Sequence, residues 1–262
     1  MKLVRDVRYE RGAECAPFDF SPGLPRGFFV KVLVIDVGGT HVKLLASRKR
    51  KSRQFDSGAD LTPAKLVDRV RENAVGWEYD VISLGLPTPV ADGAPLEEPG
   101  NLSDGWVGFD FAAAFGCPVR VLNDAAMQAL GAYTDGRMLF LGLGTGLGSA
   151  LVVEHAVITL ELGRLRFDDG EPYGHRLGKV GFERLGPAEW CRTVTTTAER
   201  LREACSADSV VFGGGRAELV DPLPPHCRRG KNEDAFTGGF RLWDERIEEH
   251  DQLPPRAWRV IV

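Results

Sequence analysis

Residues 32 to 45 have the sequence VLVIDVGGTHVKLL, which is an apolar strand, a glycine turn and a second apolar strand. The adjacent glycines Gly38 and Gly39 leave backbone N–H groups free to surround an anion, and Thr40 adds a hydroxyl donor. Asp36 lies at the end of the first strand, where a carboxylate can hold a hydrated Mg²⁺ against phosphate oxygens. The stretch predicts a phosphate-binding hairpin, although two glycines also suit an ordinary tight hairpin.

Residues 138 to 153 repeat this pattern, with a turn that contains Gly144, Thr145 and Gly146. Neither hairpin has the Gly-Lys-Ser/Thr ending of a P-loop, and each turn leads into a strand rather than into the helix of a dinucleotide-binding fingerprint. Phosphate contacts in both turns would therefore come mainly from backbone N–H groups and threonine hydroxyls. Two facing turns of this kind can hold the phosphates of one donor between two lobes.

Hydrophobic periodicity places both hairpins in a chain of alternating strands and helices, which predicts an α/β fold. Outside the second hairpin, the predicted strands are 30–35, 42–46, 53–56, 81–86, 119–122 and 209–212. The predicted helices follow Thr62 and occupy 125–133, 190–205 and 235–246. Residues 161–186 are rich in charge and glycine, so we expect a loop there. A third glycine turn, Gly213 to Gly215, follows the last predicted strand.

The domain organisation expected from this order has two lobes and two flanking segments. We expect an irregular arm over residues 1–29, a first lobe over residues 30–124, a second lobe over residues 125–246 and a tail over residues 247–262. The closing helix, residues 235–246, is expected to pack back on the first lobe.

The composition is that of an ordinary globular protein, with 262 residues, 43% hydrophobic residues and a formal net charge of −4. That charge gives no general attraction to nucleic acids or anionic membranes, and no apolar stretch approaches membrane-spanning length. The five cysteines include no C-x-x-C pair, so we expect reduced thiols rather than disulfides or a zinc site. These features predict a soluble cytoplasmic protein without a nucleic-acid or membrane partner.

A basic cluster, Arg48 to Arg53, lies between the second and third predicted strands. It could steer a polyanion such as polyphosphate toward the first hairpin. A hairpin tip that faces water is the alternative, because runs of like charge usually remain solvated.

The pair Asn123-Asp124 lies where a predicted strand ends and a helix begins. Asp124 could cap that helix, since aspartate is a preferred N-cap residue. It could instead act as a general base that receives the proton of an attacking hydroxyl. The amide of Asn123 favours the second interpretation, because it could hold a sugar hydroxyl in place.

The chain contains four motifs in a characteristic order: Ile35-Asp36-Val37-Gly38-Gly39-Thr40, Gly85-Leu86-Pro87, Pro118-Val119 with Asn123-Asp124-Ala125, and Leu143-Gly144-Thr145-Gly146-Leu147-Gly148. This order resembles the ROK family of sugar kinases, and most of all its short, zinc-free branch that includes polyphosphate glucokinases. The similarity extends from about Val30 to Trp243. It implies two actin-like (ribonuclease H-like) α/β lobes with the active site in the cleft.

The resemblance also implies roles for individual positions. Asp124 corresponds to the catalytic base, and Asn101, Asn123 and Glu161 correspond to contacts with the sugar. The residues that correspond to phosphate and nucleotide contacts are Gly38, Gly39, Thr40, Gly144, Thr145, Gly146, Gly213, Gly214 and Gly215. Asp36 would lie near Mg²⁺, directly or through water.

Two departures from the family pattern concern the sugar and zinc. The family usually has Glu-x-Gly-His at the sugar site, whereas this chain has Glu161-Leu162-Gly163-Arg164. Because arginine is larger and permanently charged, Arg164 could reject the usual hexose orientation or favour an anionic sugar. The Cys/His zinc cluster of many relatives is absent from the sequence, and we expect His175 to lie at the surface.

Together these features predict a Mg²⁺-dependent kinase that transfers a phosphoryl group from ATP or polyphosphate to a hexose, with the 6-hydroxyl of glucose as the leading acceptor. Relatives of this family are commonly dimers, which suggests a homodimer. The alternative is a sugar- or nucleotide-binding regulatory protein without catalytic activity, for which Arg164 is the motivation. Regulators of this family usually carry a helix-turn-helix, and residues 1–27 are too short and too rich in proline to form one.

Overall fold

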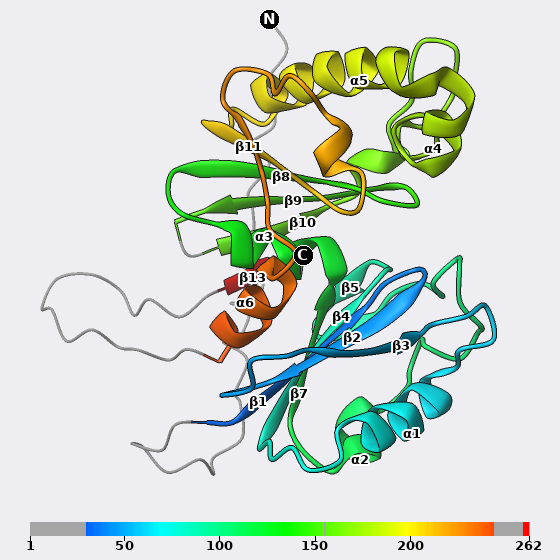
Figure 1. Cartoon of the computed structure of the whole chain (residues 1–262), viewed down its shortest axis with the longest axis vertical. Helices are drawn as coiled ribbons and strands as arrows, with labels where there is room; N and C mark the ends of the chain where they lie inside the picture. Colours follow the sequence, from blue (N-terminus) through cyan, green and yellow to red (C-terminus); the bar gives the residue numbers. More distant parts are fainter. Residues whose placement is uncertain (1–29, 155, 244–258, 262) are drawn as a thin grey trace, which may run out of the picture.

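The computed structural model describes residues 30–154, 156–243 and 259–261, which form two α/β lobes (Figure 1). The first lobe contains a sheet of five strands, β1 (Val32–Val37), β2 (His41–Ala46), β3 (Arg53–Asp56), β4 (Val81–Leu86) and β7 (Val119–Asn123). Their order in the sheet is β3-β2-β1-β4-β7. A short hairpin of β5 (Val90–Ala91) and β6 (Ala94–Pro95) follows β4.

The second lobe contains a sheet of six strands, β8 (Arg137–Leu143), β9 (Leu147–Val153), β10 (Ala156–Leu160), β11 (Ser209–Gly213), β12 (Cys227–Arg229) and β13 (Arg259–Ile261). Their order is β12-β11-β8-β9-β10-β13. In each lobe the opening hairpin is antiparallel, β1 with β2 and β8 with β9, and its first strand pairs in parallel with β4 or β11 on the other side. The two lobes therefore repeat one strand arrangement, as the repeated hairpin motif predicts.

The helices form layers on both faces of each sheet (Figure 1). Helices α1 (Pro63–Asn73) and α2 (Phe111–Phe115) cover the outer face of the first sheet, and α4 (Tyr173–Leu177) and α5 (Lys179–Ala204) lie on the outer side of the second lobe. Helices α3 (Asp124–Ala132) and α6 (Asp234–Arg241) lie between the sheets. Because helices cover both faces of the sheet, every residue of β1 and β4 is buried. The two strands therefore have nearly continuous apolar sequences rather than alternating apolar and polar residues.

Helices α3 and α6 cross at very short distance because glycines lie at the crossing. A Cβ on Gly131 would lie 1.8 Å from the carbonyl oxygen of Asp234, and one on Gly238 would lie 1.8 Å from that of Met127. Helix α6 also packs on β1, where Phe236 belongs to the same buried cluster as Val32 and Val34. The α3–α6 pair thus connects the two sheets and fixes the start of α3 at their junction.

The stretch expected to be a loop, residues 161–186, is largely helical instead. It contains the 3₁₀ turn η1 (Leu162–Arg164), α4 and the start of α5, whose helical geometry is interrupted at Gly186 (φ 74°). A partly buried carboxylate organises it: Glu171 accepts hydrogen bonds from Arg176 Nε (2.5 Å) and Arg184 (2.7 Å). Burial alone would raise the pKa of Glu171, but hydrogen bonds from Arg184, His175 and Arg176 outweigh burial and lower it to about 2.

The C-terminal part differs from the prediction in two respects. Helix α6 ends at Arg241, whereas the sequence predicts a helix over 235–246, of which residues 244–246 lie outside the described residues. Residues 259–261 form β13, which pairs in parallel with β10, although the sequence predicts no role for this tail. The arm, residues 1–29, also lies outside the described residues. In the part of the chain that the structure describes, no helix has the length and hydropathy to span a bilayer.

Candidate active site

Three segments that are distant in sequence meet at the first glycine turn. A Cβ placed on Gly39 would lie 2.8 Å from Asn101 Nδ2 and 3.2 Å from Thr145 Oγ1. Asn101 comes from the loop after β6, and Thr145 comes from the turn between β8 and β9. The two predicted phosphate-binding turns and the predicted sugar-binding Asn101 are therefore neighbours, with glycine at the point of closest approach.

Asp36 lies on β1 just before this turn and is only 8% exposed. Burial raises the pKa of its carboxyl to about 6, and the positive charge of Lys43, its antiparallel partner on β2, acts in the opposite direction. Among the described residues, none donates a hydrogen bond to the Asp36 carboxylate. A buried carboxylate without a donor is a suitable ligand for a cation.

Asp124 is the first residue of α3 and follows directly on β7. Burial raises the pKa of its carboxyl to about 7, and the negative charges of Asp36 and Glu161 act in the same direction. A hydrogen bond from the N–H of Ala125, 2.8 Å from Asp124 Oδ1, opposes this shift. A carboxyl with this pKa exchanges its proton near neutral pH, which is what a general base must do.

Asn123, rather than Asp124, caps helix α3. Its Oδ1 accepts hydrogen bonds from the N–H groups of Ala125 (3.0 Å) and Ala126 (3.2 Å), and its Nδ2 donates to the carbonyl oxygen of Thr88 (3.2 Å). The interpretation of Asp124 as the cap is therefore wrong, because its neighbour performs that function. The Asn123 amide is engaged in the fold at both ends, and its contact with a sugar stays a prediction.

Glu161 and Arg164 lie on the second lobe, on the segment after β10. The Arg164 guanidinium lies 2.6 Å from Glu97 Oε2 and 3.4 Å from Glu161 Oε2. Burial raises the pKa of Glu161, and the Arg164 charge opposes that rise. Glu97 does not stand out in the sequence, and the only available signal is its position four residues before Asn101.

The third glycine turn packs against the second hairpin. A Cβ on Gly214, which has φ 79°, would lie 2.7 Å from the carbonyl oxygen of Leu143. Arg216, which follows this turn, donates from Nη1 to the carbonyl oxygen of Gly144 (2.9 Å). Gly213 to Gly215 thus lie at the same end of the second sheet as Gly144 to Gly146, and Arg216 is a further residue there that the sequence motifs did not indicate.

The basic cluster, Arg48 to Arg53, lies at the opposite end of β2 from the first glycine turn. Six residues of strand separate the two ends, which corresponds to roughly 20 Å. Arg53 itself donates to the carbonyl oxygen of Asn73 (2.6 Å) and lies over the Trp77 ring. This position favours the interpretation of the cluster as a hairpin tip that faces water.

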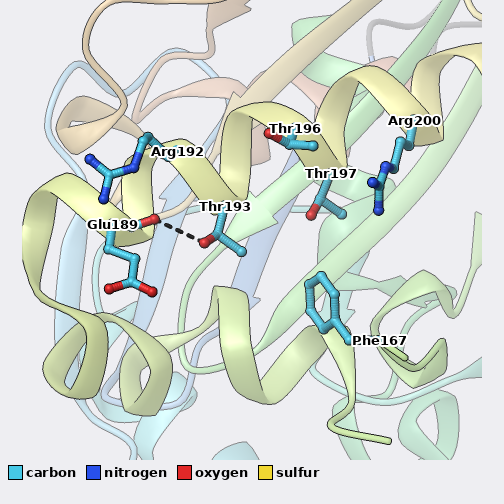
Figure 2. Close-up of a pocket in the computed structure, with 7 residues that line it drawn as sticks. All are labelled: Phe167, Glu189, Arg192, Thr193, Thr196, Thr197 and Arg200. Carbon is cyan, nitrogen blue, oxygen red and sulfur yellow. Dashed lines mark hydrogen bonds between the residues drawn. The ribbon is translucent and has the colours of Figure 1, made fainter. Parts of the chain in front are cut away.

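A cavity of about 340 Å³ lies on the second lobe, away from these carboxylates (Figure 2). Figure 2 shows that one side of α5 and Phe167 line it, and Thr193 donates to the backbone carbonyl of Glu189 (2.9 Å). None of its lining residues belongs to the group around Asp124.

The side chains that commonly bind zinc do not cluster in the described part of the chain. Within the described ranges, no group of three or more His, Cys, Asp or Glu side chains is arranged to hold a metal ion. His175 is exposed and lies 2.6 Å from Glu171 Oε1. The four cysteines in this part of the chain, Cys117, Cys191, Cys205 and Cys227, are free.

Neither a protein-family model nor a curated protein matches this sequence. Solved structures match it in fold. The inorganic polyphosphate/ATP-glucomannokinase from Arthrobacter sp. strain KM has a TM-score of 0.71 at 23% identity, over 81% of this chain and 97% of that chain. The ROK family glucokinase from Streptomyces griseus, in complex with glucose and AMPPNP, has a TM-score of 0.62 at 15% identity, over 79% and 97%. The ROK hexokinase from Thermus thermophilus has a TM-score of 0.55 at 20% identity, over 79% and 96%.

These likenesses extend over nearly the whole length of each solved chain and over about four fifths of this chain. The chain therefore has the actin-like fold of the ROK sugar kinases, and the fold implied by the four motifs is confirmed. At these identities the likeness concerns the fold alone.

Proposed function

We propose that this chain is a sugar kinase that transfers a phosphoryl group from ATP or polyphosphate to a hexose, with the 6-hydroxyl of glucose as the acceptor. The observation that carries the proposal is the convergence of the two glycine turns and Asn101, together with Asp124, whose carboxyl interacts electrostatically with that of Asp36. The fold supports the same reaction, since solved structures with this fold include a glucokinase and a polyphosphate/ATP-glucomannokinase.

In the proposed reaction, the Asp124 carboxylate accepts the proton of the sugar hydroxyl while the hydroxyl oxygen attacks the terminal phosphorus of the donor. The new O–P bond forms as the bond from that phosphorus to the bridging oxygen breaks, and the leaving group keeps the electron pair. A pKa of about 7 suits Asp124 to this step, because a base works best when its pKa lies near the operating pH.

The two glycine turns, Gly38 to Thr40 and Gly144 to Gly146, would hold the donor phosphates through backbone N–H groups and the hydroxyls of Thr40 and Thr145. Gly213 to Gly215 would border the base of a nucleotide donor. Polyphosphate would use the same turns without that third contact.

Asp36 fits the Mg²⁺ that this reaction uses. Mg²⁺ binds proteins through one or two carboxylates and completes its shell with water and phosphate oxygens. Asp36 is buried, receives no hydrogen bond from the described residues and lies near a second carboxylate, Asp124. When bound, Mg²⁺ would neutralise charge on the transferred phosphoryl group.

The sugar would bind between the two lobes. Asn101 and Asn123 from the first lobe and Glu161 from the second would contact its hydroxyls, which positions one hydroxyl beside Asp124. We propose a cytoplasmic enzyme, acting as a homodimer on small molecules, without nucleic-acid or membrane partners.

The experiment that tests this function is a matrix of donors and acceptors on purified full-length protein with Mg²⁺. ATP, GTP and polyphosphate are each offered with glucose, mannose, fructose and glucosamine, and phosphorylated sugar is measured directly. Transfer to glucose from ATP or polyphosphate is expected. Calorimetry that shows tight glucose binding, together with no transfer from any donor, would instead support the regulatory alternative.

A further inference from the structure

Arg164 connects the two lobes through a bridge of three charged side chains, Glu97, Arg164 and Glu161, which we call the interlobe bridge. Glu97 belongs to the first lobe, whereas Arg164 and Glu161 belong to the second. The guanidinium lies 2.6 Å from Glu97 and 3.4 Å from Glu161, so one side chain contacts a carboxylate from each lobe. The geometry of arginine allows this, because its planar group presents several N–H donors in different directions.

The Glu97 end of the bridge is tied to the candidate catalytic residue through the fold. Thr88 Oγ1 donates to the carbonyl oxygen of Glu97 (2.8 Å), and the carbonyl oxygen of Thr88 accepts from Asn123 Nδ2 (3.2 Å). Asn123 directly precedes Asp124 and caps its helix. A continuous path therefore leads from Asp124 through Asn123, Thr88 and Glu97 to Arg164.

The Glu161 end closes this path. The negative charge of its carboxylate raises the pKa of Asp124, so the two carboxyl groups interact electrostatically. Arg164 contacts the Glu161 carboxylate through Nε and the Glu97 carboxylate through Nη2. The bridge therefore includes Glu161, which the proposed function assigns to the sugar.

The charges of the bridge decide what it can recognise. The positive charge of Arg164 is shared between two carboxylates, which leaves the three groups with a net charge of −1. When it is ionised, Asp124 adds a further negative charge that interacts with Glu161. An anionic sugar would meet repulsion there, whereas an uncharged sugar would meet well-oriented hydrogen-bond acceptors.

We propose that Arg164 is a positioning residue that holds the two lobes together through Glu97, orients the Glu161 carboxylate for an uncharged sugar, and excludes anionic sugars. This inference rests on the proposed function for the identity of the ligand, but not for the existence of the bridge. Exposed ion pairs contribute modestly, and all three side chains are about half exposed, so effects of threefold to tenfold are expected.

The bridge itself is tested without any ligand, by amide hydrogen exchange of residues 94–101. Glu97→Gln and Arg164→Gln should each speed exchange there by threefold or more, because each releases the loop from the second lobe. Arg166→Gln is the matched control: Arg166 lies on the same segment, and its guanidinium donates to Gly170 within that segment (2.6 Å). Unchanged exchange in both bridge variants would overturn the proposal.

The role in sugar binding is tested by calorimetry with glucose on the two single variants and on the double variant. Each single change should raise the glucose Kd three- to tenfold and leave kcat within twofold of the unmodified value. The double variant should have the same Kd as the single variants, because both changes break the same bridge. If the glucose Kd rises in Arg164→Gln but not in Glu97→Gln, Arg164 contacts the sugar directly, which contradicts the proposal. Arg166→Gln should bind glucose like the unmodified protein.

The charge selectivity is tested with glucuronate as the anionic probe. The unmodified protein should bind glucuronate at least tenfold more weakly than glucose, and Glu97→Gln should narrow this ratio because it frees positive charge on Arg164. Equal binding of the two sugars by the unmodified protein would contradict the proposal. If no sugar is phosphorylated at all, the proposed function fails, while the exchange experiment still decides whether the bridge exists.

Discussion

The two glycine hairpins occupy equivalent places in their sheets, yet they differ in the chemistry of one cross-strand pair of residues. In β1–β2 the pair that precedes the last rung is Asp36 with Lys43, and in β8–β9 it is Gly142 with Gly148. At this pair the first hairpin therefore carries a carboxylate and an ammonium group, whereas the second has no side chain.

The glycines of the second hairpin provide space rather than charge. A Cβ on Gly148 would lie 2.8 Å from the Cβ of Ala125, the second residue of α3. Because this position is glycine, α3 can begin directly against β9, and Asp124 at its first position stays at the junction. Under the proposed function, the first hairpin would supply the metal-binding carboxylate, and the second makes room for the helix that would carry the base.

The strongest test of this division of roles is Asp36→Asn. If the first hairpin supplies the charge that holds Mg²⁺, this variant should lose roughly 100-fold in kcat, the size typical of removing one preorganised electrostatic group. Steady-state kinetics at several Mg²⁺ concentrations measure it. A near-normal kcat of Asp36→Asn at low Mg²⁺ would show that Asp36 does not hold the metal ion.

The contrast between the turns can be sharpened with Gly39→Ala and Gly144→Ala. A Cβ at position 39 would lie 2.8 Å from Asn101 Nδ2, whereas a Cβ at position 144 meets nothing within 4 Å. We expect a loss of about tenfold in kcat/KM for Gly39→Ala, because a small displacement of a positioning group is costly. Gly144→Ala is the matched control and should change kcat/KM by less. Equal losses would indicate that the two turns are used alike.

A pH experiment tests the burial of the Asp36 charge. The pKa of Asp36 is raised from 3.8 to about 6, so the protonated form stabilises the folded state below pH 4, and this contribution is lost as the pH rises through 6. Asp36→Asn should therefore raise the free energy of unfolding at pH 8 in Mg²⁺-free buffer by about 1–3 kcal/mol. Denaturant titrations should show that this gain vanishes near pH 4. A gain of equal size at both pH values would contradict the assignment.

The smallest effect is expected at the other end of the first hairpin. Neutralising Arg48, Lys49, Arg50 and Lys51 together should leave the KM for ATP within twofold, because roughly 20 Å of strand separates this tip from the glycine turn. The KM for polyphosphate, measured at low and high salt, should also stay within twofold. A salt-sensitive rise for polyphosphate alone would show that the tip guides this donor after all.

The local features of this fold could be predicted from sequence because contiguous residues encode them. Apolar runs on either side of a glycine turn specify both hairpins, and Thr62 followed by Pro63 specifies the start of α1, where Thr62 accepts from Lys65 N–H (3.3 Å). Asp124 could be singled out as a candidate from the sequence for the same reason, since it lies where a predicted strand ends and a predicted helix begins.

Contacts between distant, exposed residues could not be predicted in this way. Glu97 and Arg164 are 67 positions apart, and each has the sequence context of a charged residue that faces water. The helices within residues 161–186 were not predicted, because this stretch is rich in glycine and charge. The ion pairs of Glu171 that organise it also join residues that are not adjacent in the sequence. Residues 259–261 pair with β10 through backbone hydrogen bonds, which leave little trace in a sequence.

The central claim is that Asp124 is the base at the junction of the two hairpins, and Asp124→Asn tests it most directly. With glucose and the best donor at pH 8, kcat should fall roughly 100-fold or more, while calorimetry should show a glucose Kd within threefold of the unmodified protein. Turnover that stays near normal in Asp124→Asn, with sugar binding intact, would contradict the account.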